Sequence, residues 1–140
     1  MTENDGKVFV LNMEEETKSN TNFRTTLWTG KHTQLTVMSI EVGGEIGLEV
    51  HADVDQFLRV EAGAAQLITG PSKEEVSETA ELQPDTAVLI PAGTWHNVKN
   101  IGDSELKVYS LYSPPEHAPG TIHKTKAEAD EAEAAEHGES

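Results

Sequence analysis

The 140-residue chain has no cysteine, few cations and few aromatic residues. The absence of cysteine excludes disulfides and thiolate chemistry and fits the cytoplasm. Ten lysines and arginines stand against 25 acidic residues, which gives a net charge of −15. Binding to nucleic acid or to anionic lipid needs clustered cations, so this charge disfavours both. The sequence also lacks an apolar run long enough to span a membrane and a secretory signal near its start, so we expect a cytoplasmic protein.

Short apolar runs alternate with turn residues through the middle of the chain. The expected strands cover residues 35–41, 47–51, 56–61, 64–69, 76–82, 87–90, 95–100 and 107–112. Many short strands at regular spacing, without crossover helices, predict an all-β barrel or jelly roll. We therefore expect a polar N-terminal arm over residues 1–22, a barrel over residues 23–113, and a C-terminal arm with an acidic tail over residues 114–140.

The two ends of the chain are polar and carry weaker signals. Val8–Leu11 is the one apolar run of the N-terminal arm and is a candidate edge strand. The acidic run Glu14–Glu16 is expected to be a solvated loop or turn. Near the C-terminus, alanine and glutamate favour a short helix, for which Thr125 is the candidate N-cap and Thr125 to Glu128 forms a capping box.

Two histidines, His51 and His96, are the candidate ligands of one metal ion. Side chains two positions apart on a strand share a face, so Asp53 is expected to point the same way as His51. Gln56 begins the inward-facing set of the next strand. Two imidazoles and Asp53 would form a two-histidine, one-carboxylate site typical of non-haem Fe(II), whereas two imidazoles and Gln56 would form a neutral, weaker site. The sequence leaves both alternatives open.

The segments around these histidines resemble the two motifs of the cupin superfamily. The second motif reads Pro-x-Gly-x-x-His-x-x-x-Asn, and its four named positions are filled by Pro91, Gly93, His96 and Asn100. The first motif is a variant, because Asp53 and Gln56 stand where a histidine and a glutamate are usual. The resemblance implies a cupin double-stranded β-helix, or jelly-roll barrel, that forms a homodimer and holds one divalent ion, either Zn, Mn, Fe or Ni.

Two further segments, residues 23–32 and 112–126, resemble a subgroup of small cupins labelled mannose-6-phosphate isomerase-like. In that context, the candidate acids or bases are His117, His123 and Glu49. Arg24 and Lys31 are candidates to bind a phosphate or carboxylate of the substrate.

Three functions are therefore open for a small-molecule ligand or substrate. The first is a metal-dependent enzyme of sugar or sugar-phosphate isomerisation. The second is a dioxygenase that uses Fe or Ni on a small organic acid or phenol. The third is a binding protein without catalytic activity, since one fold can host many chemistries.

Overall fold

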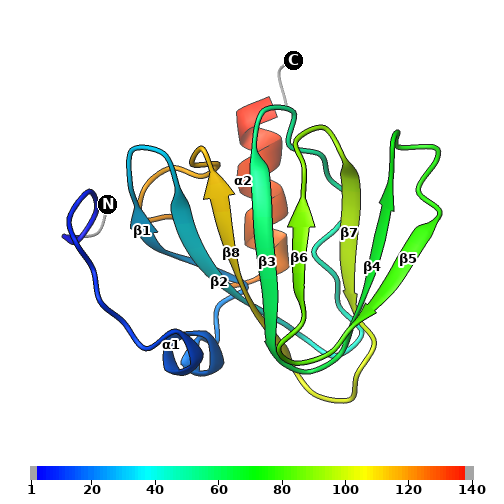
Figure 1. Ribbon diagram of the computed structural model, residues 1–140, viewed down its shortest axis with the longest axis horizontal. Coiled ribbons are helices and arrows are strands. Elements are labelled where there is room, and N and C mark those ends of the chain that lie inside the picture. Colours follow the sequence, from blue (N-terminus) through cyan, green and yellow to red (C-terminus); the bar gives the residue numbers. More distant parts are fainter. Residues whose placement is uncertain (1–2, 138–140) are drawn as a thin grey trace.

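A computed structural model describes residues 3–137 of the chain, which form two antiparallel β-sheets and two helices (Figure 1). The larger sheet has the strand order β6-β3-β8-β2-β1-β9, and the smaller has the order β5-β4-β7. The strands are β1 (Arg24–Thr29), β2 (Gln34–Ile40), β3 (Asp55–Ala62), β4 (Ala65–Gly70), β5 (Glu78–Leu82), β6 (Ala87–Ile90), β7 (Trp95–Asn100), β8 (Leu106–Ser113) and β9 (Ile122–His123). The helices are α1 (Met13–Ser19) and α2 (Lys126–His137). The two antiparallel sheets confirm the predicted β architecture.

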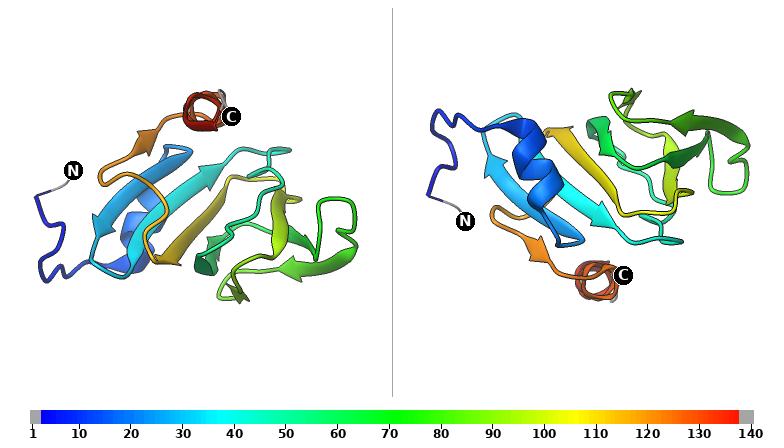
Figure 2. Two further views of the ribbon diagram at one scale, coloured as in Figure 1. Left: turned by 90° about the horizontal axis from the view of Figure 1, so that it is seen from above. Right: turned by 90° about the horizontal axis from the view of Figure 1, so that it is seen from below.

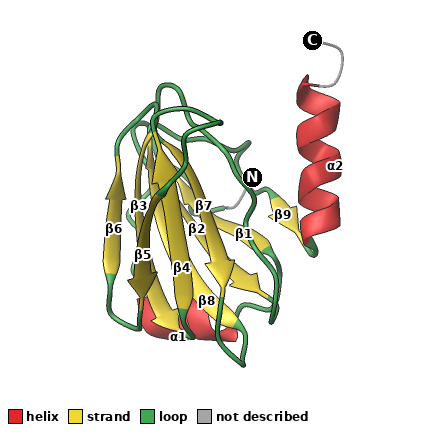
Figure 3. Ribbon diagram, turned by 90° about the vertical axis from the view of Figure 1, so that its right-hand side faces the viewer, coloured by secondary structure: helices red, strands yellow, loops and turns green. Residues whose placement is uncertain are grey.

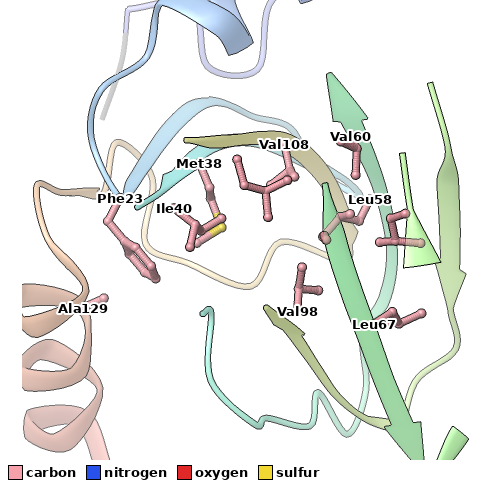
Figure 4. Close-up of a cluster of buried hydrophobic side chains, with 12 residues drawn as sticks. Phe23, Met38, Ile40, Leu58, Val60, Leu67, Val98, Val108 and Ala129 are labelled. Carbon is pink, nitrogen blue, oxygen red and sulfur yellow. The ribbon is translucent and has the colours of Figure 1, made fainter. Parts of the chain in front are cut away.

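The core lies between the sheets and is built from alternate residues of the central strands. In the larger sheet, β8 lies between β2 and β3, and Val108 is opposite both Met38 and Val60. These side chains pack with Leu67 and Val98 of the smaller sheet (Figure 4). Burial of such aliphatic side chains stabilises the fold by about 1.5–3 kcal/mol for each one removed from water.

The inner face of the larger sheet changes from apolar to polar along its strands. On β2, the inward residues Met38 and Ile40 join the core cluster, whereas Gln34 and Thr36, further back on the same face, are polar and fully buried. On β8 and β3, the corresponding polar residues are Ser110, Tyr112 and Gln56. Buried polar groups cost free energy unless they find partners. This polar half of the interior is therefore where a functional site is expected.

The larger sheet contains two strands that the sequence did not predict. The strand predicted over residues 47–51 is wrong. β1 and β9 pair with each other, with Arg24 opposite His123. Residues 47–51 form no regular strand; Glu49 within them and Glu45 before them each make one isolated bridge to β7. Gly47, which has a φ of 109°, begins this irregular segment and explains why no continuous ladder forms.

The N-terminal arm also differs from the prediction. The acidic run Glu14–Glu16 belongs to helix α1, which begins after Asn12, whose side-chain oxygen accepts a hydrogen bond from the Glu15 amide at 2.9 Å. Three glutamates in the first turn also interact favourably with the helix dipole. Val8–Leu11 is not a strand, and Val8 is 94% exposed.

The C-terminal helix α2 begins as predicted at Thr125, whose hydroxyl accepts a hydrogen bond from the Glu128 amide at 3.1 Å. Helices α1 and α2 lie on opposite sides of the larger sheet (Figure 2), and α2 stands beside β9 (Figure 3). Ala129 of α2 contributes to the core cluster beside Phe23. Among residues 3–137, no helix is both long and apolar enough to cross a membrane.

Candidate metal centre

Backbone hydrogen bonds hold the segments that carry Glu49, His51 and His96 side by side. Glu49 and His96 exchange two backbone N–H···O bonds of 2.9 Å in an isolated antiparallel bridge. The turn after β6 fixes His51, because the amide of Gly93 donates to the His51 carbonyl at 2.9 Å. Gly93 has a φ of 85°, which explains the glycine at this place in the motif. Three potential ligands, all near β7, are thus brought together.

The side chains of Glu49, His51 and His96 converge on one point. The Glu49 Oε1 atom lies 3.3 Å from His51 Nε2 and 3.4 Å from His96 Nε2. One ligand atom from each of the three residues lies within 4.8 Å of the other two. Each would need to move little to coordinate a common ion at the roughly 2.0–2.2 Å that is usual for nitrogen and carboxylate ligands.

The outer nitrogens of both histidines have partners that fix the rings. His96 Nδ1 donates to the Thr94 carbonyl at 3.0 Å, so in the neutral ring the proton lies on that nitrogen and Nε2 keeps its lone pair. His51 Nδ1 lies 3.2 Å from Glu116 Oε2. The Nε2 atoms of both rings are buried and make no hydrogen bond within the described residues. Two buried nitrogens that face one carboxylate fit a divalent ion well.

Without a metal, the site is a buried network of opposite charges. Burial raises the pKa of Glu49, but the close contacts with the imidazoles of His51 and His96 outweigh burial and hold that pKa well below its usual range. Burial lowers the pKa of His51, but Glu116 and Glu49 outweigh it and raise that pKa to about 9. Glu49 is thus ionised at neutral pH, as a carboxylate ligand must be.

A cavity of about 110 Å³ lies beside Glu49 and His51. Its walls also include residues from the C-terminal arm and from both β1 and β9, namely Arg24, Glu116, His117 and His123. Arg24 is 7% exposed, its Nη1 lies 3.1 Å from His123 Nδ1, and its Nε makes no hydrogen bond within the described residues. Tyr112 packs edge-on against both His51 and His117, with ring centroids 5.7 and 5.2 Å away.

The sequence-predicted site residues fall into two groups. The structure places His51, His96 and Glu49 together, and it places Arg24, His117 and His123 around the adjoining cavity. Of the other three predicted residues, Asp53 and Lys31 lie elsewhere, whereas Gln56 lies in the buried polar half of the interior.

Asp53 is exposed in the turn that follows His51 and lies outside the Glu49, His51 and His96 group. The expected sharing of a face with His51 fails because the chain turns at residues 52–53. Gln56 is buried and faces inward as expected; its Nε2 donates to Ser110 Oγ at 3.1 Å, and its Oε1 has no hydrogen-bond partner among the described residues. Lys31 is exposed in the turn between β1 and β2 and does not line the cavity.

The sequence did not predict the contact between Glu116 and His51. Glu116 lies 65 positions after His51, in a proline-rich stretch without periodicity, and only the tertiary fold brings the two together. The one available signal was its position beside His117, which had already been singled out as a candidate.

Comparisons with known proteins agree with this architecture. A family model described as the cupin domain matches residues 36–112. The uncharacterized protein YrkC of Bacillus subtilis is 52% identical over 127 residues, which cover 91% of this chain and 68% of that protein. The crystal structure of BH2720 from Bacillus halodurans has 54% sequence identity and a TM-score of 0.87, and the match covers 88% of this chain and 93% of that one.

A more distant match has the same fold. The structure of KdgF from Halomonas sp. is 22% identical with a TM-score of 0.58, and the match covers 66% of this chain and 78% of that one. At this level of identity the similarity concerns the fold alone. On the family match and the close relatives, the chain belongs to the cupin domain family.

Proposed function

We propose that this cupin binds one divalent ion, preferably Fe(II), through Glu49, His51 and His96, and that it is a dioxygenase of a small organic acid. The observation that carries the proposal is the convergence of Glu49 Oε1 with the Nε2 atoms of both histidines at 3.3 and 3.4 Å. Two imidazoles and one carboxylate form the ligand set typical of non-haem Fe(II) oxygenases. When bound, such an ion supplies open positions at which O₂ and a substrate can meet.

Residues around the site would set the charge and the orientation of the metal ligands. Glu49 enters the site ionised, and Thr94 and Glu116 orient the two imidazoles through their Nδ1 atoms. Burial raises the pKa of Tyr112 to about 12, so this residue stays a neutral wall between His51 and His117. These groups thereby fix the charge and geometry of the site before any substrate enters.

The cavity favours a small substrate that is held through one anionic group. A volume of about 110 Å³ corresponds to about four water molecules at roughly 30 Å³ each, which suits a short organic acid rather than a hexose phosphate. Arg24 is the only lysine or arginine among the described residues that line the cavity. One guanidinium can pair with one carboxylate in a two-pronged contact. We propose that Arg24 makes this contact and that His117 Nε2, which is also buried and has no partner among residues 3–137, hydrogen-bonds the same substrate.

The sugar-phosphate isomerase hypothesis has less support. Isomerisation needs a base in addition to a Lewis acid, and because Glu49 would already be a metal ligand, only His117 and His123 remain of the predicted bases. A phosphate normally needs several cations, whereas Lys31 lies away from the cavity. The mannose-6-phosphate isomerase-like label, the homodimer and the cytoplasmic location stay predictions.

The test is metal content and oxygen uptake of protein purified without chelator, measured for the wild type and for Glu49→Gln and His96→Ala. Asp53→Asn is the matched control, because it removes a nearby carboxylate that lies outside the three-residue group. We expect near-stoichiometric metal in the wild type and the control and its loss in the other two. Oxygen consumption with short carboxylic acids should need Fe(II). Metal without oxygen uptake would leave a binding protein or an isomerase, and no metal after reconstitution would refute the proposal.

A further inference from the structure

The two histidines of the candidate metal site are oriented by different kinds of partner. His96 donates to the carbonyl of Thr94, two residues away on the same turn, so the local chain fixes its ring. His51 has no such local partner for Nδ1, which instead lies 3.2 Å from Glu116 Oε2. The His51 side chain is 7% exposed, and that of Glu116 is 32% exposed. The orientation of His51 therefore depends on a distant segment of the chain.

One buried side chain fastens that segment to the barrel. Gln34, in the polar half of the interior, is fully buried. Its Oε1 accepts from the amides of Glu116 at 3.1 Å and of His117 at 2.9 Å, and its Nε2 donates to the His117 carbonyl at 2.7 Å. The same Nε2 donates to Thr29 Oγ1 at 3.0 Å. One amide group thus satisfies three backbone groups of the C-terminal arm and holds its main chain in place.

We propose that Glu116 is a positioning residue for the metal ligand His51 and that Gln34 acts through it by holding the arm. A carboxylate on the outer nitrogen of a ligating histidine keeps the proton on that nitrogen, orients the ring and makes the other nitrogen a stronger ligand. The metal site is therefore complete only when residues 116–117 are docked on the barrel. This inference rests on the proposed metal site at Glu49, His51 and His96.

The same arm also connects the metal site with the cavity. Because His117 follows Glu116 directly, docking on Gln34 places one side chain against His51 and the next against Tyr112 and the cavity. Loosening the arm should thus weaken metal binding and open the cavity together. Neither effect requires a change in the three ligands themselves.

The experiment measures the dissociation constant for Zn(II) and Fe(II) by competition with a chelator of known affinity. Glu116→Ala is expected to weaken binding about 10- to 100-fold, the usual effect of removing such a partner. Glu116→Gln, whose amide oxygen still accepts from Nδ1, should recover part of that loss. Glu133→Ala is the control, because Glu133 lines the same cavity with the same charge and has no described contact with His51.

A second readout reports directly on His51. In the Zn(II)-loaded wild type, the Nδ1 proton of His51 should give a slowly exchanging, downfield NMR signal, which Glu116→Ala should abolish. A wild-type-like affinity and signal in Glu116→Ala would overturn the positioning role while leaving the metal site intact. A wild type that binds neither metal would instead refute the proposed function, and the positioning role with it.

A double-mutant cycle tests the part played by Gln34. If Gln34 acts through Glu116, Gln34→Ala weakens metal binding in the wild type and has little further effect in Glu116→Ala. Equal losses in both backgrounds would mean that Gln34 acts independently and would overturn its assignment. Gln34→Met, which keeps the volume of the side chain without its hydrogen bonds, provides the same comparison should the alanine variant fold poorly.

Discussion

The half-buried imidazole of His117 should make the metal-free protein lose stability in weak acid. Burial, together with the nearby Arg24 guanidinium, lowers the pKa of His117 from 6.5 to about 4, against the opposing effect of Glu116. In the unfolded chain, the same imidazole accepts a proton near pH 6.5. As the pH falls from 6.5 to about 4, the unfolded state therefore binds a proton that the folded state excludes, and the free energy of unfolding decreases. Below about pH 4 both states are protonated and this contribution no longer changes.

The size of the effect follows from the two pKa values. At about 1.36 kcal/mol for each pH unit between them, His117 accounts for about 3 kcal/mol of lost stability at pH 4 relative to pH 7. Such a loss is a large part of the 5–15 kcal/mol that stabilises a typical domain. His117→Gln should remove it, because an amide does not titrate in this range.

The assay is urea unfolding of metal-free wild type and His117→Gln at intervals from pH 7 to pH 4. The difference in free energy of unfolding between the two proteins should change by about 3 kcal/mol in favour of the variant as the pH falls. Contributions from titratable groups that do not interact with His117 are common to both proteins and cancel in the difference. His32→Gln, at an exposed histidine in the turn between β1 and β2, controls for the loss of a histidine as such. Parallel pH profiles for wild type and His117→Gln would refute the reasoning.

Two further variants test the fold around the site. Leu58→Ala removes a core side chain that is 1% exposed and should lower the free energy of unfolding by about 2–5 kcal/mol, measured by urea titration. A loss below about 1 kcal/mol would contradict the assigned packing. Asn100→Ala removes an amide that donates to the carbonyls of Ile40 and Ser104 at 3.0 and 2.9 Å, and each buried acceptor left unpaired costs about 1–3 kcal/mol. Asn100→Asp keeps one hydrogen bond, from the Gly102 amide, and should still be destabilised because it cannot donate to the carbonyls.

The sequence predicted the fold well because period-two alternation and turn residues are local properties. Ile40, Leu58 and Val98 lie in predicted strands and occupy the core between the sheets. Asn100, the last named residue of the second motif, hydrogen-bonds the backbone of the turn that follows it, at Gly102 and Ser104. β1 was missed because its alternation is between buried polar residues, Arg24 and Thr26, and half-buried neighbours. A hydrophobic pattern cannot detect a strand whose inward side chains are polar.

The arrangement of the residues around the cavity could not be predicted from the sequence. Arg24, His117 and His123 were singled out one by one, but nothing in the sequence places residue 24 beside residue 123. Their meeting depends on β9, a two-residue strand that pairs with β1 at the edge of the larger sheet. The contact between Glu116 and His51 depends in turn on the buried amide of Gln34, more than 80 positions earlier in the chain than the amides it binds. Such long-range contacts need the fold itself.

The sequence also could not decide whether Glu49 or Asp53 is the carboxylate beside His51. Both residues lie two positions from His51, so strand periodicity places both on its face and cannot separate them. The backbone decides between them, because Glu49 is bridged to His96 by two hydrogen bonds while the chain turns away after His51 and leaves Asp53 exposed. A histidine at position 53 would be exposed in the same turn, so replacing Asp53 with histidine should not create a third imidazole ligand. In the proposed site Glu49 supplies the carboxylate, from the side of His51 that is bridged to β7.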